Sequence, residues 1–198
     1  MNSMRRAAVV VPVCGRQVLM MERAGHLRFQ PNFHSFPGGV IEPSDDPLHH
    51  EGPGPANARC AALREMVEEV GLLGPGSFDK SADEIRVKIG ENDNDVGGIL
   101  ASGADWSRWR YLGVWTTPEY AHIRFETHFF ACEFDRHESP SINSEVAKAW
   151  WLDENEALTA WDAGLMPAAP PVVAALRAAL NPQEPFCRKG HARDLLCA

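Results

Sequence analysis

The stretch from residue 59 to residue 70 constrains this chain more than any other feature of its sequence. At about 100° per residue of an α-helix, one face carries the apolar side chains Leu63, Met66, Val67 and Val70. Glu65, Glu68 and Glu69 fall on the opposite face, at spacings of three and four residues. Like charges at such spacings each cost a helix about 0.2–0.5 kcal/mol. The sequence therefore predicts an amphipathic helix with three crowded carboxylates opposite its packing face.

A helix face with three carboxylates has two interpretations. It is either a solvated acidic surface, which is the commoner case when three glutamates are considered alone, or a cluster of metal ligands. Hard oxygen ligands held this close are what Mg²⁺ and Mn²⁺ require, with waters and substrate phosphates completing an octahedral shell. The helix by itself leaves both interpretations open, and the choice depends on the surrounding sequence.

The composition of the 198-residue chain is that of a globular protein and excludes several functions. Hydrophobic residues make up 44% and charged residues 23%, which argues against a disordered chain. The net charge of -8 argues against a nucleic-acid binder, whose contact surface is basic. No apolar run approaches the roughly 18 residues of a membrane span. The five scattered cysteines include no CxxC pair, which predicts reduced thiols and a cytoplasmic protein.

The remaining sequence predicts strands that alternate with a few helices. Strands are expected at 7–13, 17–22, 111–116, 123–134 and 150–152. Helices are expected at 57–70, 153–163 and 171–180, with a weaker helical pattern at 82–89. Asn57 and Asp153 are suited to cap two of these helices, and Gly71 is suited to end the first in a left-handed conformation. This order fits a mixed sheet with helices on its faces.

Two glycines upstream and the residues around the glutamates decide between the two interpretations of the acidic face. Gly38 and Gly39 are followed, after a longer stretch, by the string REMVEEVGL at residues 64–72. This combination resembles the Nudix box of the Nudix hydrolases, a loop–helix–loop that binds divalent metal and the diphosphate of the substrate. The string agrees with the second half of the box at every fixed position. The resemblance implies a Nudix-type α/β/α sandwich, a mixed β-sheet with helices on both faces.

The chain is accordingly expected to be a single Nudix hydrolase domain over residues 1–198, with the box at about 38–72 and a loose tail at 181–198. Two features depart from the box. Asp45 stands six residues after Gly39, where the family usually has glutamate, and residues 46–56 lengthen the loop before the helix. A longer loop adds little closure entropy. We therefore expect metal binding to survive, and the role of Asp45 stays open.

The resemblance also implies roles for particular residues. The expected ligands of Mg²⁺ or Mn²⁺ are Glu65, Glu68, Glu69, Glu145 and the carbonyl of Gly39. Glu145 qualifies because it precedes a late strand, but it is equally consistent with a solvated loop residue. The metal neutralises the diphosphate and activates a water, whose proton goes to Glu68, Glu69 or Glu145. Arg64 is expected to pair with a box glutamate and to fix its rotamer.

Two further stretches indicate a substrate. Arg23 and Arg28 precede FPGG at residues 36–39 at the spacing of a motif found in coenzyme A-cleaving Nudix enzymes, although Asn32 replaces a glycine and Ala24 a serine. Residues 115–118, 124–130 and 170–171 resemble the peroxisomal coenzyme A diphosphatase branch, which also has a lengthened box loop. The expected substrate-binding residues are Arg23, Arg28, Arg124 and Phe125. The arginines suit bidentate phosphate contacts, and each is equally consistent with a surface ion pair.

The resemblance thus implies a hydrolase that cleaves the diphosphate bond of a nucleoside diphosphate linked to another group, with coenzyme A or acyl-CoA as substrate. One alternative is a Nudix hydrolase of ADP-ribose, NADH or nucleoside triphosphates. Another is a catalytically silent nucleotide-binding regulator, which Asp45 and the long loop motivate. The expected partner is the small-molecule substrate, with neither nucleic acid nor membrane. The sequence does not indicate an oligomeric state, although Nudix enzymes are often homodimers.

Overall fold

The computed structural model describes residues 4–45, 52–91, 93, 96–183 and 186. Their strands are β1 Arg5–Cys14, β2 Gln17–Arg23, β3 His34–Ser35, β4 Gly38–Val40, β5 Trp109–Thr116, β6 Phe125–Glu133 and β7 Val146–Asp153. Their α-helices are α1 Ala56–Val70, α2 Ala82–Gly90, α3 Val96–Gly103, α4 Glu154–Asp162 and α5 Pro170–Leu180. Two 3₁₀ helices, η1 Pro43–Asp45 and η2 Trp106–Arg108, complete the described elements.

The seven strands form one mixed sheet. Its main path runs β3-β2-β1-β6-β5, with β4 added beside β1 and β7 beside β2. β6 lies parallel to β1, whereas the other pairs of strands are antiparallel. Along its second edge β1 pairs first with β4, at residues 7–9, and then with β2, at residues 13–14. Pro12, which has no N–H to donate, lies between these two stretches and so interrupts neither of them.

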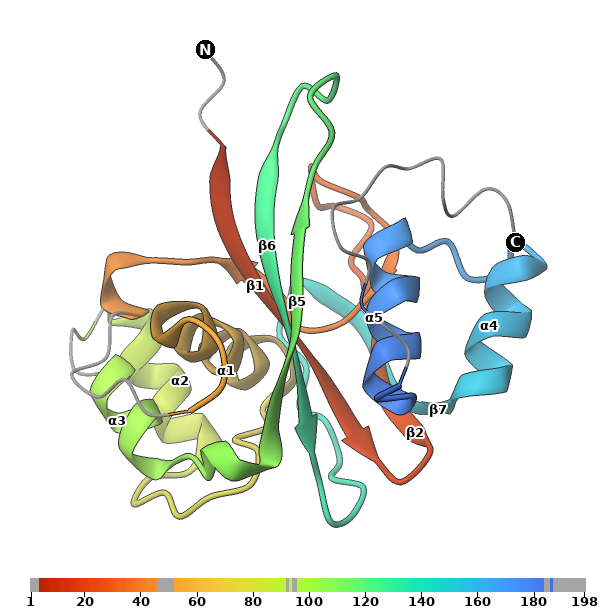
Figure 1. The fold of residues 1–198 in the computed structure, drawn as a ribbon. Coiled ribbons are helices and arrows are strands. Elements are labelled where there is room, and N and C mark those ends of the chain that lie inside the picture. The colour runs from red at the N-terminus through yellow and green to blue at the C-terminus, as the bar shows by residue number, and fades with distance from the viewer. Residues whose placement is uncertain (1–3, 46–51, 92, 94–95, 184–185, 187–198) are drawn as a thin grey trace.

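Helices cover both faces of this sheet, as Figure 1 shows. α1, α2 and α3 lie on one face, where α1 packs Leu63 and Met66 into a core with Val10 and Phe130 from the strands. α4 and α5 lie on the other face, where Leu176 packs into a second core. The expected mixed sheet with helices on both faces is therefore confirmed. None of the helices in the described ranges combines the length and apolar character needed to cross a bilayer.

The sequence predictions for the ends of the helices are confirmed at two positions and wrong at a third. Gly71 ends α1 with a φ of 68°, and its N–H bonds to the carbonyl of Val67, as the sequence predicts. Asp153 caps α4 by accepting from the N–H of Asn155. The predicted cap of α1 is wrong, because the helix begins after Pro55 and the side chain of Asn57 bonds to the N–H of Ala58.

Several segments differ from the sequence prediction. The weak helical pattern at 82–89 is the helix α2, but α3 was not predicted, and neither were the short strands β3 and β4. β7 starts at Val146 and is longer than the expected strand at 150–152. The tail was expected to be loose from residue 181, yet Phe186 is buried against Trp115 and Phe129. Most of the lengthened box loop, residues 46–51, and residues 187–198 of the tail lie outside the described residues.

Candidate active site

The acidic face of α1 lies against Gly38 and Gly39 at the start of β4, which are called the glycine turn below. Gly39 pairs with Ala8 of β1, which places this turn at the centre of the sheet. A Cβ atom on Gly39 would overlap the carboxylate of Glu65. The missing side chain therefore lets Glu65 lie directly against the backbone of β4, a close approach that only glycine permits.

Glu69 is held at the same turn by the backbone. It is 3% exposed, and its Oε2 accepts a hydrogen bond of 2.9 Å from the N–H of Gly38. Its Oε1 lies 4.0 Å from Nη1 of Arg23, at the end of β2. The two interactions fix the carboxylate of Glu69 between α1, β4 and β2.

Arg64 connects the acidic residues on the other side of the turn. Its Nη1 lies 2.9 Å from Oε1 of Glu65 and 3.3 Å from Oε2 of Glu68. The expected pairing of Arg64 with a box glutamate is therefore present. Its Nη2 also donates to the carbonyl of Val40 in β4, at 3.0 Å.

Asp45 forms a further ion pair with Arg64. Its carboxylate accepts from Nε of Arg64 at 2.8 Å and from Nη2 at 3.1 Å, a two-point ion pair between side chains that are both buried. Asp45 also accepts from the N–H of Glu42 at 2.8 Å, within the turn η1. Although burial alone would lower the pKa of Arg64, the hydrogen bonds to Asp45 and the charge of Glu65 raise it. Asp45, whose role the sequence left open, is thus the anchor that keeps this guanidinium charged and oriented.

The carboxylates of the site have unusual acidities. Burial, with a contribution from the charge of Glu68, raises the pKa of Glu65 to about 7 despite the opposing effect of Arg64. Burial and the charge of Glu65 raise the pKa of Glu69 well above its usual value, against the effects of the Gly38 N–H and Arg23. The negative charges of Glu65 and Glu69 disfavour each other, so binding of a positive charge beside them would be favourable.

A divalent cation would supply that charge, and the residues present fit one by their chemistry. Glu65, Glu68 and Glu69 offer the carboxylate oxygens that Mg²⁺ and Mn²⁺ prefer. In the described residues, no three acidic, histidine or cysteine side chains already converge on one point suited to an ion. Arg64 holds Glu65 and Glu68 in the ion pairs given above, so these side chains would turn to bind a metal.

Glu145 and Arg23 lie beside this cluster. The charge of Glu145 contributes to the raised pKa of Glu69, which places it near the site although its side chain is exposed. Its carbonyl accepts from the N–H of Ala24 at 2.8 Å. The chain just before Glu145 is tied to α1, because the N–H of Asn143 donates to the carbonyl of Glu69.

The other expected substrate residues are placed differently. Arg28 is exposed in the loop after β2. Arg124 donates from Nε to the carbonyl of Thr117 at 3.2 Å, within the turn between β5 and β6. Phe125 contacts Phe29, with ring centroids 5.7 Å apart. Sequence reasoning missed Phe29, and its only signal was an aromatic residue beside Arg28 in an otherwise irregular stretch.

Comparison with known proteins agrees with these features. Residues 4–87 match the model of the NUDIX domain. A Caenorhabditis elegans protein named as nudix hydrolase 7 is 30% identical over 188 residues, which cover 87% of this chain and 59% of that protein. The chain thus spans about three fifths of the length of this relative.

Two solved structures show the same fold. A NUDIX hydrolase from Alicyclobacillus acidocaldarius aligns with a TM-score of 0.75 and 28% identity, over 91% of this chain and 92% of that one. The NUDIX domain of Shewanella oneidensis NrtR, crystallised with ADP ribose, aligns with a TM-score of 0.57 and 13% identity, over 92% and 90% of the two chains. In its glycine turn, its acidic helix and its fold, the chain is thus similar to Nudix proteins, and its residues 4–87 match the NUDIX domain.

Proposed function

We propose that the chain is a divalent-metal-dependent hydrolase of the diphosphate bond in a nucleoside diphosphate linked to a second group. The observation that carries this proposal is the pair of buried carboxylates, Glu65 and Glu69, beside the glycine turn. A divalent cation at this place would relieve their repulsion and would attract the negative oxygens of a diphosphate. The match of residues 4–87 to the NUDIX domain and the names of the similar proteins support the same activity.

The residues that would hold Mg²⁺ or Mn²⁺ are Glu65, Glu68, Glu69, Glu145 and the carbonyl of Gly39. When bound, the metal supplies charge neutralisation at the diphosphate and a lowered pKa for the attacking water.

The chain's own residues position these groups. Arg64 orients Glu65 and Glu68 through its ion pairs, and the N–H of Gly38 orients Glu69. A carboxylate beside the water takes its proton, and the candidates are Glu68, Glu69 and Glu145. Of the three glutamates on α1, Glu68 has the most exposed side chain, at 39%, and therefore the easiest access to water.

Coenzyme A and its thioesters are our first choice of substrate. The spacing of Arg23 and Arg28 before the glycine turn supports it, because coenzyme A-cleaving Nudix enzymes share that motif. Arg23 lies 4.0 Å from Glu69, where its guanidinium would meet a phosphate bound at the acidic cluster. ADP-ribose is the second candidate, since the Shewanella domain with the same fold was crystallised with that compound.

A catalytically silent regulator has less support. It was motivated by Asp45 and the long loop, but Asp45 anchors Arg64 through two hydrogen bonds and so maintains the arrangement of the acidic face. An aspartate at this position therefore gives no reason for a loss of catalysis.

The proposal is tested by incubating the purified protein with Mg²⁺ or Mn²⁺ and separating the products. Coenzyme A, acyl-CoA, ADP-ribose and NADH are the substrates to compare. We expect coenzyme A to yield adenosine 3′,5′-bisphosphate and 4′-phosphopantetheine. Cleavage of ADP-ribose or NADH without turnover of coenzyme A would move the assignment to the second substrate class. No cleavage of any of these compounds would favour the regulator.

Matched variants locate the chemistry on α1. Glu68→Gln and Glu69→Gln should each reduce kcat at least about a hundredfold, the usual range for a lost general base. Glu156→Gln removes an exposed glutamate from α4, on the opposite face of the sheet, and should retain full activity. Equal activities in all three variants would contradict the assignment of the site.

A further inference from the structure

The loop between β2 and β3 holds an aromatic side chain close to the acidic cluster. Phe29 is 45% exposed, so its ring is accessible to a ligand. Its carbonyl accepts from Nε of Arg23 at 3.4 Å, and Nη1 of the same arginine lies 4.0 Å from Glu69. One guanidinium therefore ties the position of Phe29 to the site proposed for the diphosphate.

The backbone of this loop is bent in a way that residues with side chains disfavour. Gln30 has a φ of 48° and Asn32 a φ of 61°, both in the left-handed region. Such conformations are uncommon outside glycine and cluster at functional sites. Two hydrogen bonds hold the bend, one between the N–H of Phe33 and the carbonyl of Gln30, the other between the N–H of Asn32 and the carbonyl of Arg23. The bend keeps Phe29 at the surface.

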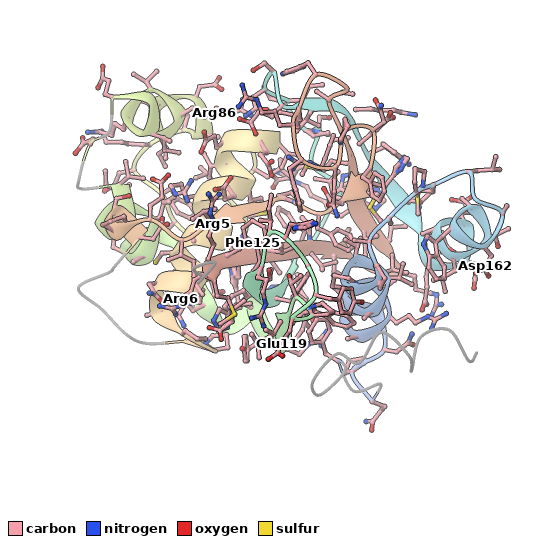
Figure 2. The ribbon with its side chains drawn as sticks, turned by 90° about the horizontal axis from the view of Figure 1, so that it is seen from above. Arg5, Arg6, Arg86, Glu119, Phe125 and Asp162 are labelled. Atoms are coloured by element: carbon pink, nitrogen blue, oxygen red, sulfur yellow. The ribbon has the colours of Figure 1, made fainter. Side chains whose placement is uncertain are left out.

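Phe29 rests on Phe125, and Phe125 has an arginine beside it. Arg5 is the register partner of Phe125 in the parallel pair of β1 and β6. Side chains at paired positions point to the same face of a sheet, and neighbouring strands lie about 4.8 Å apart. The N–H of Arg5 donates to the carbonyl of Arg124 at 3.0 Å, which fixes this end of β1. Figure 2 shows Arg5 and Phe125 next to each other near the start of the two strands.

Arg5 is available for a ligand, whereas its neighbour Arg6 is not. Arg6 is paired with Glu126, at 3.8 Å, and both point to the other face of the sheet. In the ranges that the structure describes, Arg5 forms no ion pair with a carboxylate and is exposed. A free guanidinium beside an exposed ring, Phe29, and a half-buried ring, Phe125, suits an anion attached to a flat group.

The distance along β1 between the glycine turn and Arg5 fits the length of a single nucleoside. Gly39 of the glycine turn pairs with Ala8, three residues from Arg5. At about 3.3 Å per residue, Arg5 begins about 10 Å along the sheet from the place proposed for the diphosphate. Phe125 lies beside Arg5 in the register of β1 and β6, and Phe29 contacts Phe125. Arg23 connects the loop of Phe29 to Glu69.

We propose that Phe29, Phe125 and Arg5 form a subsite for a nucleoside that carries a phosphate on its ribose. The two aromatic rings contact the base, and Arg5 contacts the ribose phosphate. This inference rests on the proposed function, which places the diphosphate of the same substrate at Glu65 and Glu69. Arg5 then distinguishes substrates with a ribose phosphate from those that lack it.

The test measures binding rather than cleavage. Adenosine 3′,5′-bisphosphate and AMP share the base and the 5′-phosphate and differ only in the ribose phosphate. Calorimetric titration of each into the purified protein with Mg²⁺ should show tighter binding of the bisphosphate, by about tenfold. Arg5→Ala should abolish this preference and leave the dissociation constant of AMP unchanged. Arg6→Ala, the matched control one residue away on the opposite face, should retain the preference.

Phe29 is tested with the same two nucleotides. Phe29→Ala should raise both dissociation constants at least about fivefold, because stacking on an aromatic ring contributes to both in the same way. Phe29→Leu keeps an apolar side chain but removes the ring, and it should also lose affinity for both. Phe29 is exposed, so neither variant should lower the melting temperature by more than a few degrees.

The inference would be overturned by equal affinity of the unaltered protein for the two nucleotides. It would equally be overturned if Arg5→Ala weakened both to the same extent, or if Phe29→Ala changed neither. These results are distinguishable from failure of the proposed function. A protein that cleaves coenzyme A while ignoring these substitutions disproves the subsite alone, and one that binds the bisphosphate selectively without cleaving any diphosphate disproves the activity alone.

Discussion

A buried guanidinium needs the protein to supply its hydrogen bonds, because water cannot reach it. Arg64 is 5% exposed, and its partners come from η1, β4 and α1 itself. The side chain therefore makes the geometry of the acidic face depend on three separate segments. Asp45 contributes the strongest of these contacts, with two charged hydrogen bonds.

Removing Asp45 should destabilise the protein strongly. Asp45→Ala leaves Arg64 buried without its main partner, and breaking such a pair costs about 3–5 kcal/mol. Urea unfolding followed by circular dichroism would measure the loss. Asp162→Ala removes an exposed aspartate at the end of α4 and should change the free energy of unfolding by less than about 0.5 kcal/mol. An Asp45→Ala variant as stable as this control would contradict the anchoring role.

Single residues explain both the success and the limits of the sequence prediction. The proximity of Arg64 to Glu65 and Glu68 was predictable because all three lie within two turns of the same helix, where spacing determines proximity. The contact of Arg23 with Glu69 joins residues from different elements, and no local pattern encodes it. Asn32, which stands where the resembled coenzyme A motif has a glycine, has a φ of 61°, in the left-handed region that asparagine tolerates.

At the scale of elements, predictions held where periodicity was strong and failed where tertiary contacts decide. α1 has a continuous apolar stripe and was expected almost to its observed length. α3 has the sequence VGGILASG, whose glycines disfavour a helix. It forms because it packs against α1 and η1, where a Cβ on Gly97 would overlap the carbonyl of Ser44. The missed helix thus supports the turn that contains Asp45.

Gly97→Ala tests this support. Alanine is the better helix former by about 1 kcal/mol, so a gain in stability is expected if the local sequence alone matters. Because the new Cβ would overlap η1, we expect instead a net loss of about 1–3 kcal/mol, typical of overpacking, together with reduced hydrolase activity. Gly90→Ala at the end of α2 has open space around it and serves as the control. A stabilised Gly97→Ala variant would disprove the dependence of η1 on α3.

For the whole molecule, the acidic face predicts how stability varies with pH. The pKa of Glu65 is about 7 in the folded chain and near 4.5 when unfolded, so the folded state binds more protons between these values. Without metal, the contribution of Glu65 to the free energy of unfolding is therefore fully present below about pH 4.5. This contribution is lost as the pH rises through 7. The raised pKa of Glu69 acts in the same direction.

Melting temperatures measured from pH 5 to pH 8 would check this dependence. In EDTA the melting temperature should fall as the pH rises, and Glu65→Gln should flatten the curve. Saturating Mg²⁺ should stabilise the protein most at pH 8, because the metal binds the ionised carboxylates. Identical pH profiles for the unaltered protein and Glu65→Gln would contradict the account of the buried acids.

Titration of Mn²⁺ into the purified protein tests the central claim most directly, namely that the acidic face of α1 binds a divalent metal. The experiment uses calorimetry at pH 8 and is repeated with Glu65→Gln, Glu69→Gln and the control Glu156→Gln. We predict saturable binding that is weakened at least about tenfold in the first two variants and unchanged in the third. Absence of saturable binding, or equal affinity in all four proteins, would contradict a metal-dependent hydrolase at this site.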